Sequence, residues 1–118
     1  MRVVEIFHSI QGEGLLVGLP SVFVRLAGCP LRCAWCDTAY AWSEASGTPY
    51  TLQQILDEVT QYPARHVVVT GGEPLVDMDM RPREGLHDLV HGLRERGKHI
   101  TIETAGMVYV ASLECDLM

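Results

Sequence analysis

Hydrophobic residues recur along the chain with two periods, one typical of strands and one of helices. Two early runs, residues 3–7 and 21–26, are rich in Val, Ile and Phe and are separated by a glycine-rich segment, so we predict a strand at each. Residues 66–70 are β-branched and almost wholly apolar, which predicts a strand buried on both faces. Residues 99–103 alternate between apolar and polar positions and predict a further strand.

The segments between the later strands have helical spacing. After residue 51 apolar residues follow at i, i+3, i+4 and i+7, and Thr51 and Gln54 have the spacing of a capping box. A second amphipathic pattern covers residues 86–93, and Gly97 is the residue expected just after its helix. The order strand–helix–strand–helix–strand predicts an α/β fold with a parallel sheet and right-handed crossovers. Residues 115–118 are expected to open one more strand.

Composition narrows the class of protein. The chain has 118 residues, 47% of them hydrophobic and 20% charged, which is typical of one globular domain. Nine basic against fifteen acidic residues give a net charge of −6, so neither nucleic acid nor a membrane surface is the expected partner. The start of the chain lacks the features of a signal peptide, and we expect a cytoplasmic protein. His87, His91 and His99 are expected on the solvated surface.

Three of the four cysteines, Cys29, Cys33 and Cys36, form a C-x3-C-x2-C pattern on one predicted loop. Thiolates this close together can converge on one metal centre, and iron–sulfur clusters are normally held by cysteine thiolates. Three ligands leave one iron of a 4Fe–4S cluster open to an external ligand, so the spacing favours such a cluster. A structural zinc with a histidine as fourth ligand is the alternative. Cys115 stands far from the triad in sequence and is expected to pack as a small apolar residue.

The triad, with an aromatic residue before its last cysteine and a later strand that ends in Gly-Gly-Glu-Pro, resembles the radical S-adenosylmethionine enzymes. Further segments narrow the resemblance to the 7-carboxy-7-deazaguanine synthase family: residues 9–14, 23–29, 36–38 and 103–106. The resemblance runs from about residue 3 to residue 118. It implies the N-terminal portion of a partial (β/α) barrel with parallel strands. Residues 1–118 would then be a single radical S-adenosylmethionine domain, apparently truncated at its C-terminal end.

The resemblance also implies the cofactors, a 4Fe–4S cluster on the three cysteines and S-adenosylmethionine on its open iron. The residues expected along S-adenosylmethionine are Trp35, Cys36, Asp37, Gly72 and Glu73. Two glycines let the backbone approach a ligand closely, and Glu73 offers a carboxylate to an ammonium group. Taken without the resemblance, Trp35 would be read as ordinary loop packing and Gly-Gly as a strand–loop turn.

Substrate and magnesium sites follow from the same resemblance. The residues expected to bind substrate are Ile10, Gln11, Gly12, Glu13, Arg25 and Thr70. Arg25 lies within an apolar strand, where an unpaired charge is costly, so a carboxylate partner is required. That partner is either the carboxylate of the substrate or an internal acidic residue. Thr38 matches a position that coordinates Mg²⁺, an ion that prefers oxygen ligands.

The activity implied is the lyase reaction that converts 6-carboxy-5,6,7,8-tetrahydropterin to 7-carboxy-7-deazaguanine with loss of ammonia, in queuosine and 7-deazapurine biosynthesis. Its implied partners are the small-molecule pterin and an external flavodoxin- or ferredoxin-like electron donor, and a homodimer is possible. Two alternatives stay open: an activating enzyme for a glycyl-radical protein, and a non-catalytic iron–sulfur or zinc-binding module. We expect the 118-residue chain alone to be inactive, because partial barrels need more strands than the pattern supplies.

Overall fold

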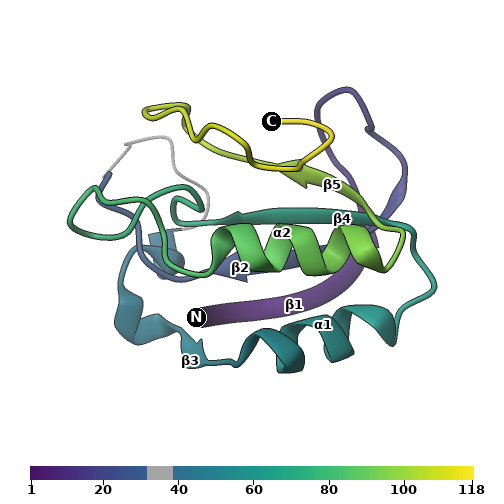
Figure 1. Ribbon diagram of the computed structural model, residues 1–118, viewed down its shortest axis with the longest axis horizontal. Coiled ribbons are helices and arrows are strands. Elements are labelled where there is room, and N and C mark those ends of the chain that lie inside the picture. Colours follow the sequence, from purple (N-terminus) through teal and green to yellow (C-terminus); the bar gives the residue numbers. More distant parts are fainter. Residues whose placement is uncertain (32–38) are drawn as a thin grey trace.

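The computed structural model describes residues 1–31 and 39–118 and contains one five-stranded sheet, in the order β3-β1-β2-β4-β5. Both α-helices of this described part lie on the same side of the sheet (Figure 1). The elements in chain order are β1 Arg2–Ile10, β2 Pro20–Leu26, η1 Ala39–Ala41, η2 Glu44–Ser46, β3 Thr48–Pro49, α1 Leu52–Thr60, β4 His66–Gly71, α2 Leu86–Glu95 and β5 His99–Ile102. Each of the four predicted strands and both predicted helices is present.

The core of the sheet is parallel, which confirms the predicted fold class. β2 pairs in parallel with β4, and β4 in parallel with β5, with α1 and α2 as the two crossovers. β1 instead pairs antiparallel with both β2 and the short β3. The last residues lie along β5, where the Ile102 N–H donates to the Leu117 carbonyl at 2.9 Å. It forms an isolated parallel bridge between Thr101 and Leu117, within the residues 115–118 where a further strand was predicted, and the described residues contain no strand after β5.

The helix ends follow the sequence rules. The Thr51 hydroxyl accepts the Gln54 N–H at 3.1 Å, and the Gln54 side chain accepts the Thr51 N–H at 2.8 Å, which completes the predicted capping box. Gly97, just beyond α2, has a φ of +72°, a conformation that glycine adopts without strain. Each helix turns one apolar face to the sheet, in α1 through Ile55, Leu56 and Val59. Burial of each such side chain contributes about 1.5–3 kcal/mol to stability.

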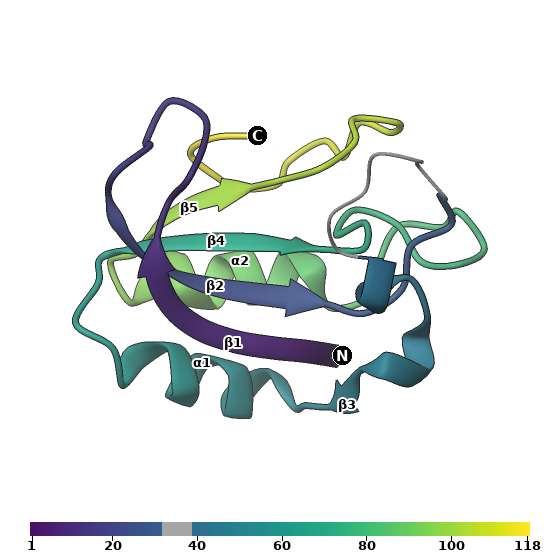
Figure 2. The same cartoon turned by 180° about the vertical axis from the view of Figure 1, so that it is seen from behind.

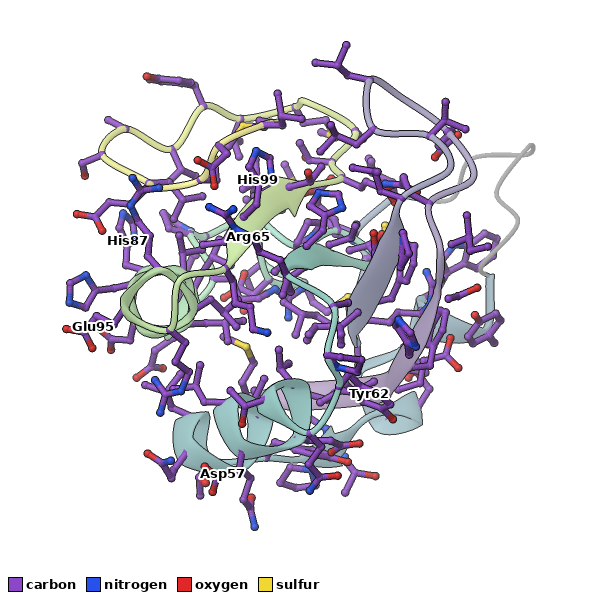
Figure 3. All side chains as sticks on the ribbon, turned by 90° about the vertical axis from the view of Figure 1, so that its right-hand side faces the viewer. Asp57, Tyr62, Arg65, His87, Glu95 and His99 are labelled. Carbon is purple, nitrogen blue, oxygen red and sulfur yellow. The ribbon has the colours of Figure 1, made fainter. Side chains whose placement is uncertain are left out.

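The two faces of the sheet differ in character. Val22, Val24 and Leu26 of β2 join the core beneath the helices, so the alternation along a strand turns Phe23 and Arg25 to the opposite face. Figure 2 views the sheet from behind, and Figure 3 views it from the end at which β4 and β5 begin. We call the face opposite the helices the inner face.

The surface predictions for the histidines are only partly correct. His87 and His91 are exposed on α2, and Figure 3 shows His87 and Glu95 pointing away from that helix. His99 is half-buried instead, because it opens β5 beside β4 and its ring lies 5.1 Å from that of His66. No helix in the described ranges has the length and apolar character needed to cross a membrane.

Candidate functional site

The three parallel strands end at one edge of the sheet, where their following loops meet (Figure 2). The Gly72 N–H donates to the Leu26 carbonyl at 3.1 Å, and the Glu73 N–H donates to the Gly28 carbonyl at 3.1 Å. The loop that begins the cysteine motif and the Gly-Gly-Glu-Pro loop are therefore joined by backbone hydrogen bonds. This is the arrangement expected of functional loops in a parallel α/β sheet.

Gly72 allows these two loops to approach closely. A Cβ added to Gly72 would lie 2.6 Å from the Cys29 Cβ and 2.6 Å from the Gly28 carbonyl oxygen. Cys29 is buried, and its N–H donates to the Trp42 carbonyl at 2.9 Å. The described part of the site therefore fits a cluster ligand, because Cys29 is buried and its Cβ is held against the backbone of Gly72, which has no side chain.

The other members of the predicted cluster and cofactor site lie outside the described residues. These are Cys33, Trp35, Cys36, Asp37 and Thr38. Their predicted roles stay predictions. Within the described ranges, no three His, Cys, Asp or Glu side chains form a group that could hold a metal ion.

Glu73 connects the loop after β4 to the segment after β5. Glu73 is only 1% exposed, and its carboxylate accepts the Leu75 N–H at 3.0 Å, the Thr104 hydroxyl at 2.7 Å and the Ala105 N–H at 2.9 Å. Three donors compensate much of the cost of burying a charged carboxylate. Glu73 thus has a structural task that the sequence did not indicate, and its predicted contact with the cofactor stays a prediction.

Arg25 has the internal partner that was one of its two predicted alternatives. Its Nε lies 2.9 Å from Glu5 Oε1, and its guanidinium lies 5.7 Å from the centre of the Tyr40 ring. Glu5 Oε1 also accepts the Tyr40 hydroxyl at 2.9 Å. The hydrogen bond to Glu5 uses Nε alone, so it leaves the two terminal nitrogens of the guanidinium for another acceptor.

The segment after β1 reaches β5 across the inner face. The Gln11 amide nitrogen donates to Glu103 Oε1 at 2.9 Å, and the Gly12 N–H donates to the Gln11 side-chain oxygen at 3.0 Å. A pocket of about 330 Å³ lies here, lined by Phe7, Ser9, Ile10, Gln11, Gly12, Glu13, Phe23 and Glu103. The Phe7 and Phe23 rings stack at 5.1 Å within it. The structure thereby brings four predicted substrate residues, at positions 10–13, into one pocket.

Arg25 and Thr70 lie next to this pocket along the strands. Arg25 and Thr70 are paired in the β2–β4 register. They follow the paired residues Phe23 and Val68 by two positions along the strands, so they lie on the same face. Thr70 is buried at 7% exposure. The inner face therefore carries aromatic rings first, then Arg25 and Thr70, and then the loops that contain Cys29 and Gly72.

Cys115 does not belong to this edge of the sheet. It is half-buried, packed against the hydrophobic core, and burial is the main cause that raises the pKa of its thiol. A thiol that resists deprotonation is a poor metal ligand. Its predicted packing role is confirmed.

Three residues of the site were missed in the sequence. Glu5 and Glu103 pair with predicted residues only through strand register and a contact across the sheet. Arg83 donates to four backbone carbonyls at the junction of the loops, from a segment without any recognisable motif. Only Glu103 could have been found from the sequence, since it begins segment 103–106, one of the segments that resemble the synthase family. The resemblance did not assign a role to it.

Comparison with known proteins identifies the class. The sequence pattern of the Radical SAM superfamily matches residues 23–114, which include the Cys29 loop, the Gly-Gly-Glu-Pro loop and most of the parallel sheet. The chain belongs to the radical S-adenosylmethionine superfamily. A 4Fe–4S cluster and S-adenosylmethionine are the cofactors that membership implies.

Individual relatives agree on a narrower name. The chain is 49% identical over 108 residues to the 7-carboxy-7-deazaguanine synthase of Hyperthermus butylicus, covering 92% of this chain and 44% of the relative. It is 46% identical over 118 residues to that of Rhodopirellula baltica, covering 100% of this chain and 43% of the relative. The crystal structure of QueE from Escherichia coli superposes with a TM-score of 0.78 at 32% identity, covering 92% of this chain and 54% of that one. The resemblance found in the sequence is confirmed, and the chain spans about half the length of the curated relatives it matches.

Proposed function

We propose that the protein converts 6-carboxy-5,6,7,8-tetrahydropterin to 7-carboxy-7-deazaguanine with loss of ammonia, and so acts as a radical S-adenosylmethionine lyase in 7-deazapurine biosynthesis. The relatives matched over 92–100% of this chain carry the name of that synthase. The observation that carries the proposal is the pocket on the inner face, with its two stacked phenylalanines and its amide and carboxylate groups.

The chemistry of the pocket suits a pterin. A flat ring system packs well on stacked aromatic side chains. The pyrimidine edge of a pterin carries both N–H donors and a carbonyl acceptor. The carboxylates of Glu13 and Glu103 can accept from the donors, and the Gln11 amide can serve either kind of group. Ile10 and Gly12 complete the rim of the same pocket.

The substrate carboxylate is assigned to Arg25. A guanidinium pairs with a carboxylate through two parallel hydrogen bonds, and the terminal nitrogens of Arg25 are not used by Glu5. Thr70, its neighbour on β4, adds a hydroxyl at the same level. This orientation directs the reacting part of the substrate toward the loops that carry Cys29 and Gly72.

The remaining assignments follow the family. Cys29, Cys33 and Cys36 would hold the cluster, and Trp35, Cys36, Asp37, Gly72 and Glu73 would hold S-adenosylmethionine. When bound, this pair supplies one-electron cleavage of a sulfonium bond and hydrogen abstraction from substrate. Thr38 would hold Mg²⁺ together with oxygen atoms of the substrate. A flavodoxin- or ferredoxin-like electron donor, a homodimer and a cytoplasmic location complete the proposal.

A ligand comparison tests the assignment of Arg25. The affinity of the chain for 6-carboxytetrahydropterin is measured anaerobically by titration calorimetry, beside that for tetrahydropterin without the carboxylate. The unaltered chain should bind the carboxylated ligand about tenfold more tightly, the factor expected for a charged hydrogen bond of about 1.4 kcal/mol. Arg25→Gln should abolish this preference, and Arg25→Lys should reduce it, because an ammonium lacks the planar pair of donors.

Arg81→Gln is the matched control, since Arg81 is an exposed arginine on the loop after β4. It should retain the full preference for the carboxylated pterin. If Arg25→Gln retains the preference as well, then Glu5 is the functional partner of Arg25 and the orientation of the substrate is wrong. If no pterin binds to the unaltered chain in the presence of cluster, S-adenosylmethionine and Mg²⁺, the proposed substrate fails for this chain.

A further inference from the structure

We propose that Arg83 is a positioning residue that holds the loop of the first cluster ligand against the loop that binds S-adenosylmethionine. The inference rests on the proposed function only in its assignment of cluster and cofactor to these two loops. We call the hydrogen bonds from the Arg83 guanidinium to these two loops the clamp, and they are present in the folded chain without cluster or cofactor. No motif in the sequence marks Arg83, which lies near the end of the loop between β4 and α2, beyond the Gly-Gly-Glu-Pro segment of the same loop.

The guanidinium of Arg83 bridges segments that are far apart in sequence. Its Nη1 donates to the Ala27 carbonyl at 2.9 Å. Its Nη2 lies within hydrogen-bond distance of three further carbonyls, those of Gly28 at 3.0 Å, Glu73 at 2.7 Å and Val76 at 2.9 Å. Two acceptors belong to the loop that follows β2 and two to the loop after β4, so one side chain joins both loops.

Arginine suits this position because its donors are spread over a rigid plane. A planar guanidinium can serve acceptors on different segments at once, whereas the ammonium of lysine is a single point on a flexible stem. The backbone of Arg83 is itself fixed, since its N–H donates to the Leu75 carbonyl at 2.9 Å. The Arg83 backbone is therefore fixed within the loop after β4, and its guanidinium extends from there to the loop after β2.

Two of the carbonyls that Arg83 contacts, those of Gly28 and Glu73, belong to residues next to the predicted cluster and cofactor ligands. Gly28 immediately precedes Cys29, and Glu73 immediately follows Gly72, where an added Cβ would lie 2.6 Å from both the Cys29 Cβ and the Gly28 carbonyl oxygen. Apart from Arg83, backbone hydrogen bonds from Gly72 to Leu26 and from Glu73 to Gly28 join these loops. Loss of the guanidinium should let the loops separate by a small distance, and small displacements at a reaction centre reduce its function strongly.

The test compares Arg83→Gln and Arg83→Lys with Arg81→Gln, an exposed arginine two positions away on the same loop. Amide hydrogen exchange of the chain before cluster assembly is the first measurement. Arg83→Gln should speed exchange at the Gly72 and Glu73 amides about tenfold, while the amides of α1 and α2 keep their protection. Arg83→Lys should fall between, and Arg81→Gln should match the unaltered chain.

The second measurement follows anaerobic assembly of the cluster with iron and sulfide. Its readouts are the rate at which a chelator removes iron and the change that S-adenosylmethionine causes in the electron paramagnetic resonance spectrum of the reduced cluster. Arg83→Gln should lose iron several times faster and should need about tenfold more S-adenosylmethionine for half of the spectral change. A residue that only supported the fold would alter the unfolding temperature without altering this titration.

The outcomes separate the two proposals. If Arg83→Gln matches the unaltered chain in both iron loss and the S-adenosylmethionine titration, the positioning role is wrong. If the unaltered chain assembles no cluster, the proposed function fails. The clamp is then tested by hydrogen exchange alone, and unchanged exchange at the Gly72 and Glu73 amides in Arg83→Gln would overturn it. If Arg83→Gln does not fold, the same comparisons are made with Arg83→Lys, and equality with the unaltered chain again overturns the proposal.

Discussion

Charged side chains at the candidate site are held by partners from neighbouring strands and loops. Arg25 of β2 pairs with Glu5 of β1, and the buried Glu73 carboxylate receives donors from Leu75, Thr104 and Ala105. Removal of one partner from a buried charged hydrogen bond leaves the other unsatisfied, at a cost of about 1–3 kcal/mol or more. The residues that prepare this site therefore also contribute to the stability of the fold.

Gly72→Ala provides a test of the close approach between the two loops. The new methyl would lie 2.6 Å from the Cys29 Cβ and from the Gly28 carbonyl oxygen, neither of which is the end of a flexible side chain. We expect a loss of about 1–3 kcal/mol in the free energy of unfolding, the usual effect of overpacking, together with a lower iron content after cluster assembly. Chemical denaturation and iron analysis measure the two effects.

Gly12→Ala is the control, because an added Cβ at Gly12 has no heavy atom within 4 Å among the described residues. It should change the free energy of unfolding by no more than about 0.5 kcal/mol, as is usual for surface substitutions. Equal stability of the Gly72 and Gly12 variants would contradict the close packing of the loops.

The fourth cysteine gives a second prediction at the scale of single residues. Cys33→Ala removes one of the three predicted thiolate ligands and should abolish the brown chromophore of the assembled cluster. Cys115→Ala should retain it, because burial raises the pKa of the Cys115 thiol and the residue packs against the core. Visible absorption and iron content after anaerobic assembly measure the result. Stoichiometric zinc in protein purified without oxygen would favour the structural zinc alternative instead.

Whole elements were easier to predict than their relative placement. The period of apolar residues and the capping box at Thr51 located both helices, and β-branched residues located β4, because these are local properties of the sequence. The antiparallel direction of β1 and the short β3 were not predicted, since strand direction depends on distant pairing. The same reason explains why the Arg25–Glu5 and Gln11–Glu103 pairs were missed, although Arg25 and Gln11 were both singled out.

The exposed face of α2 holds the segment that follows β5. His91 Nδ1 lies 3.2 Å from Glu114 Oε2, and its Nε2 lies 3.1 Å from Glu95 Oε1 on the same helix. Arg94 donates to the Glu114 carbonyl at 3.1 Å. The hydrogen bond to Glu114 and the charge of Glu95 raise the pKa of His91.

This pair predicts a pH-dependent attachment of the segment to α2. Because the folded pKa is raised, protonation of His91 stabilises the folded chain, and this contribution is complete below the ordinary pKa of 6.5 and is lost as the pH rises through the folded value. Hydrogen exchange of residues 111–116 should therefore be slower, relative to the intrinsic rate, at pH 5.5 than at pH 8.5. His91→Gln should remove most of the difference, and so should high salt, because the groups are exposed. A difference that His91→Gln leaves unchanged would contradict the assignment.

At the scale of the whole molecule, the two faces of the sheet carry different groups. The helices cover one face and bury the core there, while the inner face carries the pocket, Arg25 and Thr70. The loops with Cys29, Gly72 and Glu73 then stand at the edge where the parallel strands end. The groups proposed to bind substrate and the loops proposed to hold the cofactors thus follow one another along the same strands.

The last prediction concerns turnover by these 118 residues alone. They span about half the length of the matched synthases, and the pocket on the inner face is built from β1, β2 and residues 10–13 with Glu103. We expect the remaining half of a full-length synthase to complete the enclosure around substrate and cofactor. Radical chemistry needs a site from which water is excluded. We therefore expect cluster assembly, weak binding of S-adenosylmethionine and no multiple turnover. The assay combines the isolated chain anaerobically with carboxytetrahydropterin, Mg²⁺, S-adenosylmethionine and reductant, with the full-length Rhodopirellula baltica synthase as positive control. Repeated formation of 7-carboxy-7-deazaguanine by the chain alone would show that these residues already enclose a complete site.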